Sequence, residues 1–165
     1  MANNYIVEFT HNGKSRFCIW FTDEVDGFII EQNEIISFSN IESATNYCYT
    51  RKMKVGKDIT TYDVDNILEI VNSNTPTVDC KSILDFWNIV MDVTSSVSDT
   101  FYGNEEGIVT DIYNKLFYGN NLPAMNDTGE NFVPEWGSED IFEFKKVVED
   151  AVRIITTHIK WNFYF

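Results

Sequence analysis

The hydrophobic repeat of this chain changes from two residues in its first part to three or four residues in its second. In the first part, every second residue points to the same face, as at Tyr5, Val7 and Phe9, which is the pattern of a strand with one buried face. From Asp79 onward, apolar residues recur at the i, i+3, i+4 spacing of a helix with one buried stripe. The chain is therefore predicted to be α+β, with an N-terminal antiparallel β-meander of about four strands packed against a mainly helical C-terminal half of about four helices.

Turn and cap signals divide the first part into elements. Asn12-Gly13 is the preferred pair for a two-residue type I′ hairpin turn, because both central positions need positive φ. Ser39 and Glu42 have the spacing of a capping box, so a helix is expected to start there and to end before Gly56. Further strands are expected at 17–21, 28–31 and 35–38, and 59–64 also has the composition of a strand.

The second part is expected to be built on a central helix. Asp79 can cap a helix over about 80–98 that is apolar over most of its circumference, so that it is contacted on several sides. Its narrow polar stripe consists of Asp85, Asn88, Asp92 and Asp99. This stripe is interpreted as the only solvated face of the helix, and a row of carboxylates for a basic partner is the alternative. Two more helices are expected, at about 105–118 and from 138 to the region of residue 158, and 65–71 is either a short helix or a continued strand.

Size and composition indicate a single domain over residues 1–165, mainly β with one helix over 1–64 and mainly α over 65–165. The chain is 44% hydrophobic and contains 13 Phe, 8 Tyr and 4 Trp, which is enough for one core. The aromatic end, 161–165, is either a terminal strand or a tail packed over the core. A cytoplasmic protein is expected, because the sequence has no apolar run of membrane-spanning length, no secretory signal and no C-x-x-C pair among its three cysteines.

Charge is the strongest compositional signal. Twelve basic residues oppose 26 acidic ones, which gives a formal net charge of −14. Residues 1–57 carry a net charge of −1, whereas residues 58–165 carry −13. Such a field repels nucleic acid and anionic lipid and attracts cationic surfaces. The expected partner is a basic protein, with no direct nucleic-acid or membrane binding, and acidity that serves only solubility is the alternative.

The sequence offers little catalytic chemistry. His11 lies beside a turn, where a solvated side chain is expected, and His158 suits the negative end of the last helix. No nucleophile motif and no glycine-rich phosphate loop accompanies either histidine. The pattern predicts no enzyme, no catalytic residue, no cofactor and no metal site.

The candidate partner site lies in the long connection 120–137 and in the helix start that follows it, because long loops inside compact domains are often functional. Acidic residues and one tryptophan gather there among Phe132, Val133 and Pro134, a composition typical of interface hot spots. The predicted partner-binding residues are Asp127, Glu130, Glu135, Trp136, Glu139, Asp140 and Glu143. The alternative is that the aromatic residues anchor the loop to the protein's own core.

Two segments carry a family resemblance. Residues 83–93 read ILDFWNIVMDV, and this segment resembles the L-x-x-W-N-x-x-x-D helix of small immunity proteins encoded beside contact-dependent growth inhibition and other polymorphic toxins of bacteria. Residues 113–123 read YNKLFYGNNLP and are followed by PEW at 134–136, which is similar to the second half of the same group. The resemblance covers about residues 80–155, and its motifs are packing patterns rather than contact residues.

The resemblance implies a small, non-enzymatic, cytoplasmic protein that binds the C-terminal toxin domain of a delivery protein. Many such toxins are nucleases, often acting on transfer RNA, and their substrate grooves are basic. The expected function is neutralisation of a cognate toxin by covering its active site, with binding beside the active site as a variant and a monomer as the favoured state. Two alternatives come from other classes: a small carboxylate- or metal-dependent enzyme, and an acidic nucleic-acid mimic that binds DNA-handling proteins.

Overall fold

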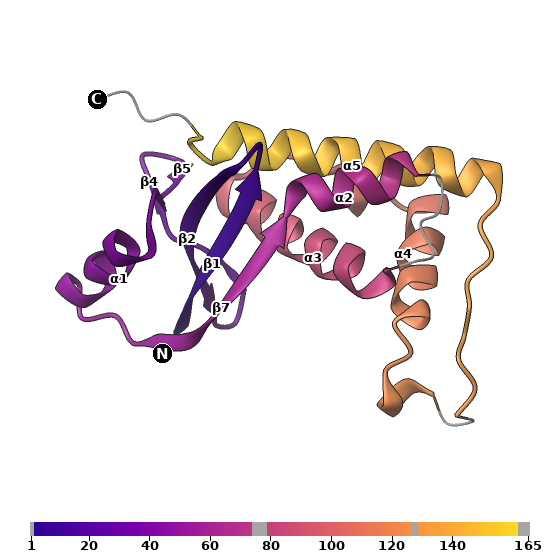
Figure 1. The fold of residues 1–165 in the computed structure, drawn as a ribbon, viewed down its shortest axis with the longest axis horizontal. Coiled ribbons are helices and arrows are strands. Elements are labelled where there is room, and N and C mark those ends of the chain that lie inside the picture. The colour runs from indigo at the N-terminus through magenta and orange to yellow at the C-terminus, as the bar shows by residue number, and fades with distance from the viewer. Residues whose placement is uncertain (1, 74–78, 127–128, 162–165) are drawn as a thin grey trace. The chain divides into compact units, whose positions relative to one another are not determined.

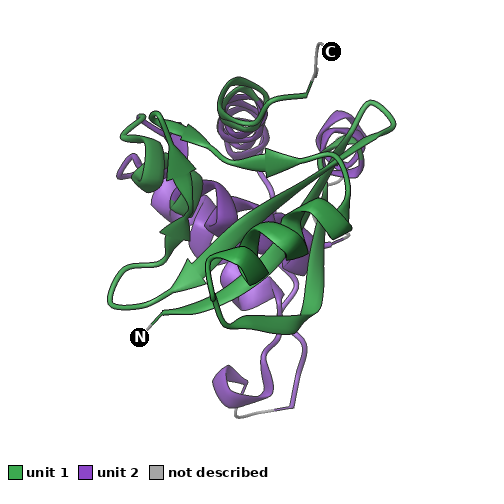
Figure 2. Ribbon diagram, turned by 90° about the vertical axis from the view of Figure 1, so that its left-hand side faces the viewer, with its two compact units in different colours: residues 1–65, 92–99, 153–165 green, residues 66–91, 100–152 purple. Residues whose placement is uncertain are grey.

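A computed structural model describes residues 2–73, 79–126 and 129–161 of the chain. The chain forms two compact units, which are coloured separately in Figure 2. The first unit contains residues 1–65, 92–99 and 153–165, and the second contains residues 66–91 and 100–152. The α+β prediction is confirmed, because the strands of the sheet precede a mainly helical second part (Figure 1). The predicted single domain stays a prediction.

The first unit is built on the predicted hairpin. Strand β1 (Asn3–His11) pairs antiparallel with β2 (Lys14–Thr22), and the turn between them has φ values of 50° at Asn12 and 72° at Gly13. Both values are positive, as a type I′ turn requires, so the turn prediction is confirmed. Short strands extend the sheet beside β2 and form a separate two-stranded ladder: β3 (Gly27–Phe28), β4 (Ile30–Glu31), β5 (Glu34–Ile35) and β6 (Ser37–Phe38).

The last strand differs from the expected antiparallel meander. Strand β7 (Val55–Asp63) pairs parallel with β1, so that the main order of the sheet is β3-β2-β1-β7 (Figure 1). Strand β2 brings the chain back to the end of the sheet where β1 starts, and residues 23–54, which include the first helix, then lead past β1 to the start of β7 at the same end. Between Gly56 and Thr61 every residue of this edge strand is exposed. Gly56 belongs to strand β7, and the helix that was expected to end before Gly56 ends at Thr50.

Five α-helices and two short 3₁₀ turns follow or interrupt the sheet in the described residues. They are α1 (Ile41–Thr50), α2 (Val64–Asn72), α3 (Cys80–Val97), η1 (Tyr102–Asn104), α4 (Ile108–Gly119), η2 (Pro123–Met125) and α5 (Ser138–His158). No helix among these residues has both the length and the apolar character needed to cross a membrane.

The helix starts agree with the sequence in one case and differ from it by one or a few residues in two others. Asp79 caps α3 as predicted, because its carboxylate accepts the main-chain N–H of Ser82 at 3.0 Å. The cap of α1 is Asn40 rather than Ser39, since the Asn40 side chain accepts the Ser43 N–H at 2.8 Å. The predicted helix at 105–118 begins only at 108, because Gly107 has a φ of 83°.

Each unit has its own apolar core. In the first, the fully buried ring of Phe9 stacks on Tyr62 with centroids 5.6 Å apart. In the second, α3 is buried on several sides, as its broad apolar circumference predicted, and Trp87 is 2% exposed. Ile112 and Leu116 of α4 are fully buried as well. Residues 162–165 of the predicted strand or aromatic tail lie outside the described residues.

Candidate functional site: an apolar pocket in the acidic unit

A pocket of about 300 Å³ lies in the second unit, where α4 ends and the chain turns back through η2. Asn120 ends the helix by donating its main-chain N–H to carbonyls of the last turn, and Asn121 follows with a left-handed φ of 51°. Pro123 then starts η2. From there the chain runs in the opposite direction to α4 (Figure 1). Helix α4, η2 and residues 130–132 of the returning segment 129–133 form the walls of the pocket.

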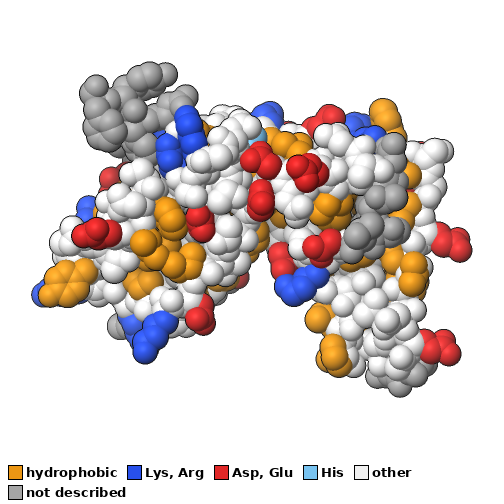
Figure 3. All heavy atoms as spheres, viewed as in Figure 1, with side chains coloured by type: hydrophobic (Ala, Val, Ile, Leu, Met, Phe, Trp, Pro, Cys, Tyr) orange, Lys and Arg blue, Asp and Glu red, His pale blue; other side chains and the backbone are white. Residues whose placement is uncertain are grey.

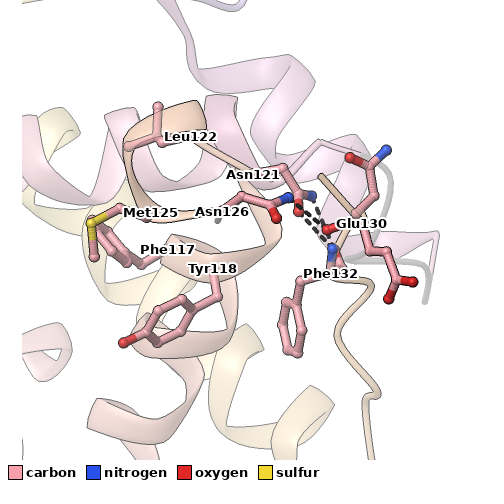
Figure 4. A pocket seen from close by; sticks show the side chains of 9 residues that line it. Phe117, Tyr118, Asn121, Leu122, Met125, Asn126, Glu130 and Phe132 are labelled. Atoms are coloured by element: carbon pink, nitrogen blue, oxygen red, sulfur yellow. Dashed lines mark hydrogen bonds between the residues drawn. The ribbon is translucent and has the colours of Figure 1, made fainter. Parts of the chain in front are cut away.

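The side chain of Asn121 fixes the returning segment. It accepts the main-chain N–H of Phe132 at 2.6 Å and donates to the Phe132 carbonyl at 3.0 Å (Figure 4). A second amide, from Asn126, donates to the Glu130 carbonyl at 2.6 Å. These bonds replace the ladder that a neighbouring strand would supply, so the returning segment is held in place although it is neither helix nor strand.

Five large apolar side chains around this pocket are exposed to solvent. They are Tyr118, Leu122, Met125, Phe132 and Val133, with exposed fractions of 50, 41, 55, 48 and 72%. We call these five residues the apolar patch. Hydrophobic side chains are visible at this end of the second unit in Figure 3. Contiguous exposed apolar surface of this kind marks interaction sites, whereas single exposed apolar residues are ordinary.

The base of the returning segment is held to the second unit by Lys115 of α4. Its Nζ donates to the Glu135 carbonyl at 2.9 Å and to the Asp140 carboxylate at 2.7 Å, and it lies 5.7 Å from the centre of the Trp136 ring. Trp136 in turn packs on the buried ring of Phe144, with centroids 6.0 Å apart. The returning segment, which carries Phe132 and Val133 of the patch, is thus held by hydrogen bonds from Asn121 on one side and from Lys115 on the other.

The predicted partner-binding residues divide into two groups. Glu130 lines the pocket, and Glu135 and Glu139 have exposed side chains. Trp136 and two of the acids have partners inside the protein: Trp136 packs on Phe144, Asp140 pairs with Lys115, and Glu143 accepts the Tyr102 hydroxyl and lies 3.3 Å from Lys146. The assignment of these residues to a partner stays a prediction. Asp127 lies outside the described residues.

Lys115 lowers the pKa of Asp140 through a side-chain hydrogen bond; partial burial opposes the effect, and the Gly137 N–H, at 2.9 Å, adds to it. Because the pKa of Asp140 is lower in the folded state, its ionised carboxylate stabilises the fold at every pH above the ordinary pKa of an aspartate, about 3.9. This stabilisation is lost as the pH falls below that value.

We therefore expect Asp140→Asn to cost about 1 kcal/mol of unfolding free energy at pH 7 and much less at pH 3. Urea unfolding at the two pH values measures this. Glu139→Gln, next to it but exposed, is the control, and an equal cost of Asp140→Asn at both pH values would contradict the assignment.

The second unit holds most of the protein's negative charge. It has 14 acidic and 4 basic residues, against 12 acidic and 8 basic in the first unit. Three of its four lysines, Lys81, Lys115 and Lys146, already pair with acids of the same unit. Exposed acids that remain include Glu105, Glu106, Asp111 and Glu149. The apolar patch therefore lies in a strongly negative field.

The polar stripe of α3 is satisfied inside the protein. Its four members pair as Lys81–Asp85, Tyr113–Asn88, Trp20–Asp92 and His158–Asp99, at 2.5 to 2.9 Å. Burial raises the pKa of Asp92, the Trp20 hydrogen bond opposes this, and the nearby Asp26 adds to it. Asp92 and Asp99 are thus held inside the first unit, whereas Asp85 and Asn88 make their bonds at the surface. The alternative that the stripe binds a basic partner stays a prediction.

The histidines and cysteines also have structural environments. His11 was expected to be solvated, but its side chain is only 16% exposed and its Nδ1 lies 2.8 Å from Asp65. Cys18, Cys48 and Cys80 are buried, and burial raises the pKa of each thiol, so that each is protonated at neutral pH. Among the described residues, no three His, Cys, Asp or Glu side chains converge as a metal site requires.

Sequence reasoning found the returning segment and missed the side of the pocket that α4 and η2 build. The predicted site did not include Tyr118, Leu122 and Met125, because it was defined by its acidic residues. Their signal was available: Leu122 and Met125 are apolar residues in a loop that has no strand or helix period. Comparisons of the chain with models of known protein families, with characterised proteins and with solved structures found no significant match.

Proposed function

We propose that this protein is a cytoplasmic immunity protein that binds and neutralises the C-terminal domain of a cognate bacterial toxin, a nuclease with a basic active-site region. The observation that carries the proposal is the apolar patch, exposed within a unit that has 14 acidic and 4 basic residues. An exposed apolar surface surrounded by charge has the composition of a protein interface. The sequence resemblance of residues 80–155 to toxin immunity proteins supplies the class of partner.

The negative field raises the rate at which basic partners associate and favours basic surfaces over others. Opposite charges steer two proteins together and raise the association rate from about 10⁵–10⁶ to as much as 10⁸–10⁹ M⁻¹s⁻¹ at low salt. The groove of a nuclease is positive because it binds phosphate groups, so an acidic protein that covers it excludes the nucleic acid. Neutralisation then follows from occlusion of the groove, and the inhibitor needs no catalytic residue.

Co-expression with the toxin domain encoded immediately upstream of this gene tests the proposal. The tagged protein is expected to capture that domain in a 1:1 complex and to restore growth. A double charge reversal of two exposed acids, Glu135→Lys with Glu139→Lys, is expected to slow association at least tenfold at low salt and to weaken its salt dependence. The matched control reverses Asp23 and Glu24, which are exposed in a turn of the first unit.

Three results would contradict parts of this proposal. A toxin domain that kills despite co-expression and is not captured would exclude immunity as the function. Capture with unchanged kinetics in the Glu135 and Glu139 variant would place the interface on another surface. A larger effect of the Asp23 and Glu24 control would assign the interface to the first unit.

A further inference from the structure

The pocket beside the apolar patch has walls of two kinds. Apolar atoms come from side chains that include Phe117, Leu122 and Met125, and the polar wall is formed by side-chain amides together with Glu130. Among the described residues that line the pocket, Glu130 alone carries a charge, and the charge is negative. An occupant that matches both walls needs a long apolar stem and a positively charged polar end.

Two aromatic rings flank the opening. Tyr118 and Phe132 meet edge to face, with centroids 6.3 Å apart and an interplanar angle of 73°. In an edge-to-face pair, one ring presents only its edge to the other, so the faces of that ring are not covered by its partner. Both side chains are about half exposed. A cation placed over such a face is attracted by the ring, and a guanidinium is the protein cation that most often does so.

The acidic group lies on the same side as these rings. Glu130 and Phe132 are two residues apart, the spacing at which side chains of an extended segment point the same way. Figure 4 shows the Tyr118 ring, the Phe132 ring and the Glu130 carboxylate directed to one side of the loop. A carboxylate has about four acceptor positions, so it can keep local hydrogen bonds and still receive a planar guanidinium.

We propose that this pocket anchors one arginine side chain of the basic partner, with its stem against the apolar wall and its guanidinium between the Phe132 ring and Glu130. The proposal rests on the proposed function, because it takes the partner to be a basic protein. Arginine fits better than lysine, since its planar and weakly hydrated head stacks on a ring and pairs with a carboxylate at the same time. The hydrogen bonds from Asn121 hold the wall in place before binding, so little ordering is needed.

Binding kinetics with the captured toxin domain test the proposal. Phe132→Leu keeps an apolar side chain but removes the ring, and Glu130→Gln keeps the shape but removes the charge. Each is expected to weaken binding at least tenfold, mainly through faster dissociation, and the double variant is expected to lose less than the product of both, because both groups hold one guanidinium. Val25→Ala is the matched control, since Val25 is exposed but lies in the first unit, outside the apolar patch.

Outcomes for this pocket and for the immunity function are distinguishable. If the unaltered protein captures the toxin and both Phe132→Leu and Glu130→Gln bind as tightly, the pocket proposal is overturned and the function stands. If Phe132→Leu weakens binding but Glu130→Gln does not, the occupant is an apolar side chain and the arginine proposal is wrong.

A second measurement needs no toxin. Acetyl-Gly-Arg-Gly-amide and its lysine counterpart are titrated at millimolar concentration while NMR follows the ring signals of Tyr118 and Phe132. The arginine peptide is expected to shift these signals several-fold more than the lysine peptide, and Glu130→Gln is expected to remove the difference. Equal responses to both peptides, or no response to either, would overturn the proposal even if the toxin is not captured.

Discussion

Trp87→Ala is expected to lower the unfolding free energy by about 3 to 5 kcal/mol, the range for removing a large aromatic side chain from a packed core. Trp87 lies in α3, is 2% exposed and meets the rings of Phe101 and Tyr113 edge to face, with centroids 6.2 and 5.5 Å away. The main chain also approaches it, because a Cβ on Gly103 would lie 2.8 Å from the indole nitrogen. The surroundings are therefore unable to close around the space that the indole leaves.

Urea unfolding followed by far-UV circular dichroism measures this loss, and Trp87→Phe separates its two causes. The indole N–H is buried and has no acceptor among the described residues. Phenylalanine keeps much of the ring and removes this unsatisfied donor, so its cost is expected to be only about 1 to 2 kcal/mol. Met91→Ala, on the exposed side of the same helix, is the control at about 1 kcal/mol or less. A Trp87→Ala cost no larger than that of Met91→Ala would show that α3 is not the central helix of the second unit.

Arg16→Met is expected to have the next largest effect, about 2 to 4 kcal/mol, because it removes donors from three main-chain carbonyls. Arg16 is 8% exposed, and its guanidinium donates to Lys160 O at 2.8 Å, to Ser15 O at 2.7 Å and to Trp161 O. Burial lowers the pKa of Arg16, yet a guanidinium remains charged at neutral pH. The side chain thus fastens the chain beyond α5 to strand β2 within the first unit.

Arg16→Lys tests whether geometry or charge carries this effect. A lysine ammonium cannot reach three carbonyls with the fork of a guanidinium, so Arg16→Lys is expected to lose at least half as much stability as Arg16→Met. Lys57→Met, on the exposed strand β7, is the control, with a change within about 0.5 kcal/mol. Full stability of Arg16→Lys would mean that the positive charge alone matters.

The parts of the fold that were predictable from sequence are those encoded within a few residues. The Asn12-Gly13 turn fixed the register of its hairpin, in which Val7 lies opposite Cys18. The parallel pairing of β7 with β1 was not predictable, because its partners are about 50 residues apart and parallel pairing has no turn signal.

The candidate site was half predictable for the same reason. The acidic residues between 127 and 143 lie in and beside the loop that lines the pocket, so their composition pointed to this region. Which of them remain exposed depends on Lys115, which pairs with Asp140 across 25 residues of sequence. The pocket itself depends on Asn121 bonding to Phe132, and nothing in the composition distinguishes that asparagine from its neighbour Asn120.

The alternation of the two units along the chain has an evolutionary consequence. The chain passes between them at residues 65/66, 91/92, 99/100 and 152/153, and three of these passages lie within α2, α3 and α5. No continuous stretch of sequence contains either unit alone, so recombination at a single point cannot exchange one unit and leave the other intact. Under the proposed function, a change of partner is therefore expected to come from substitutions at surface residues of the loop between α4 and α5, where they disturb little packing.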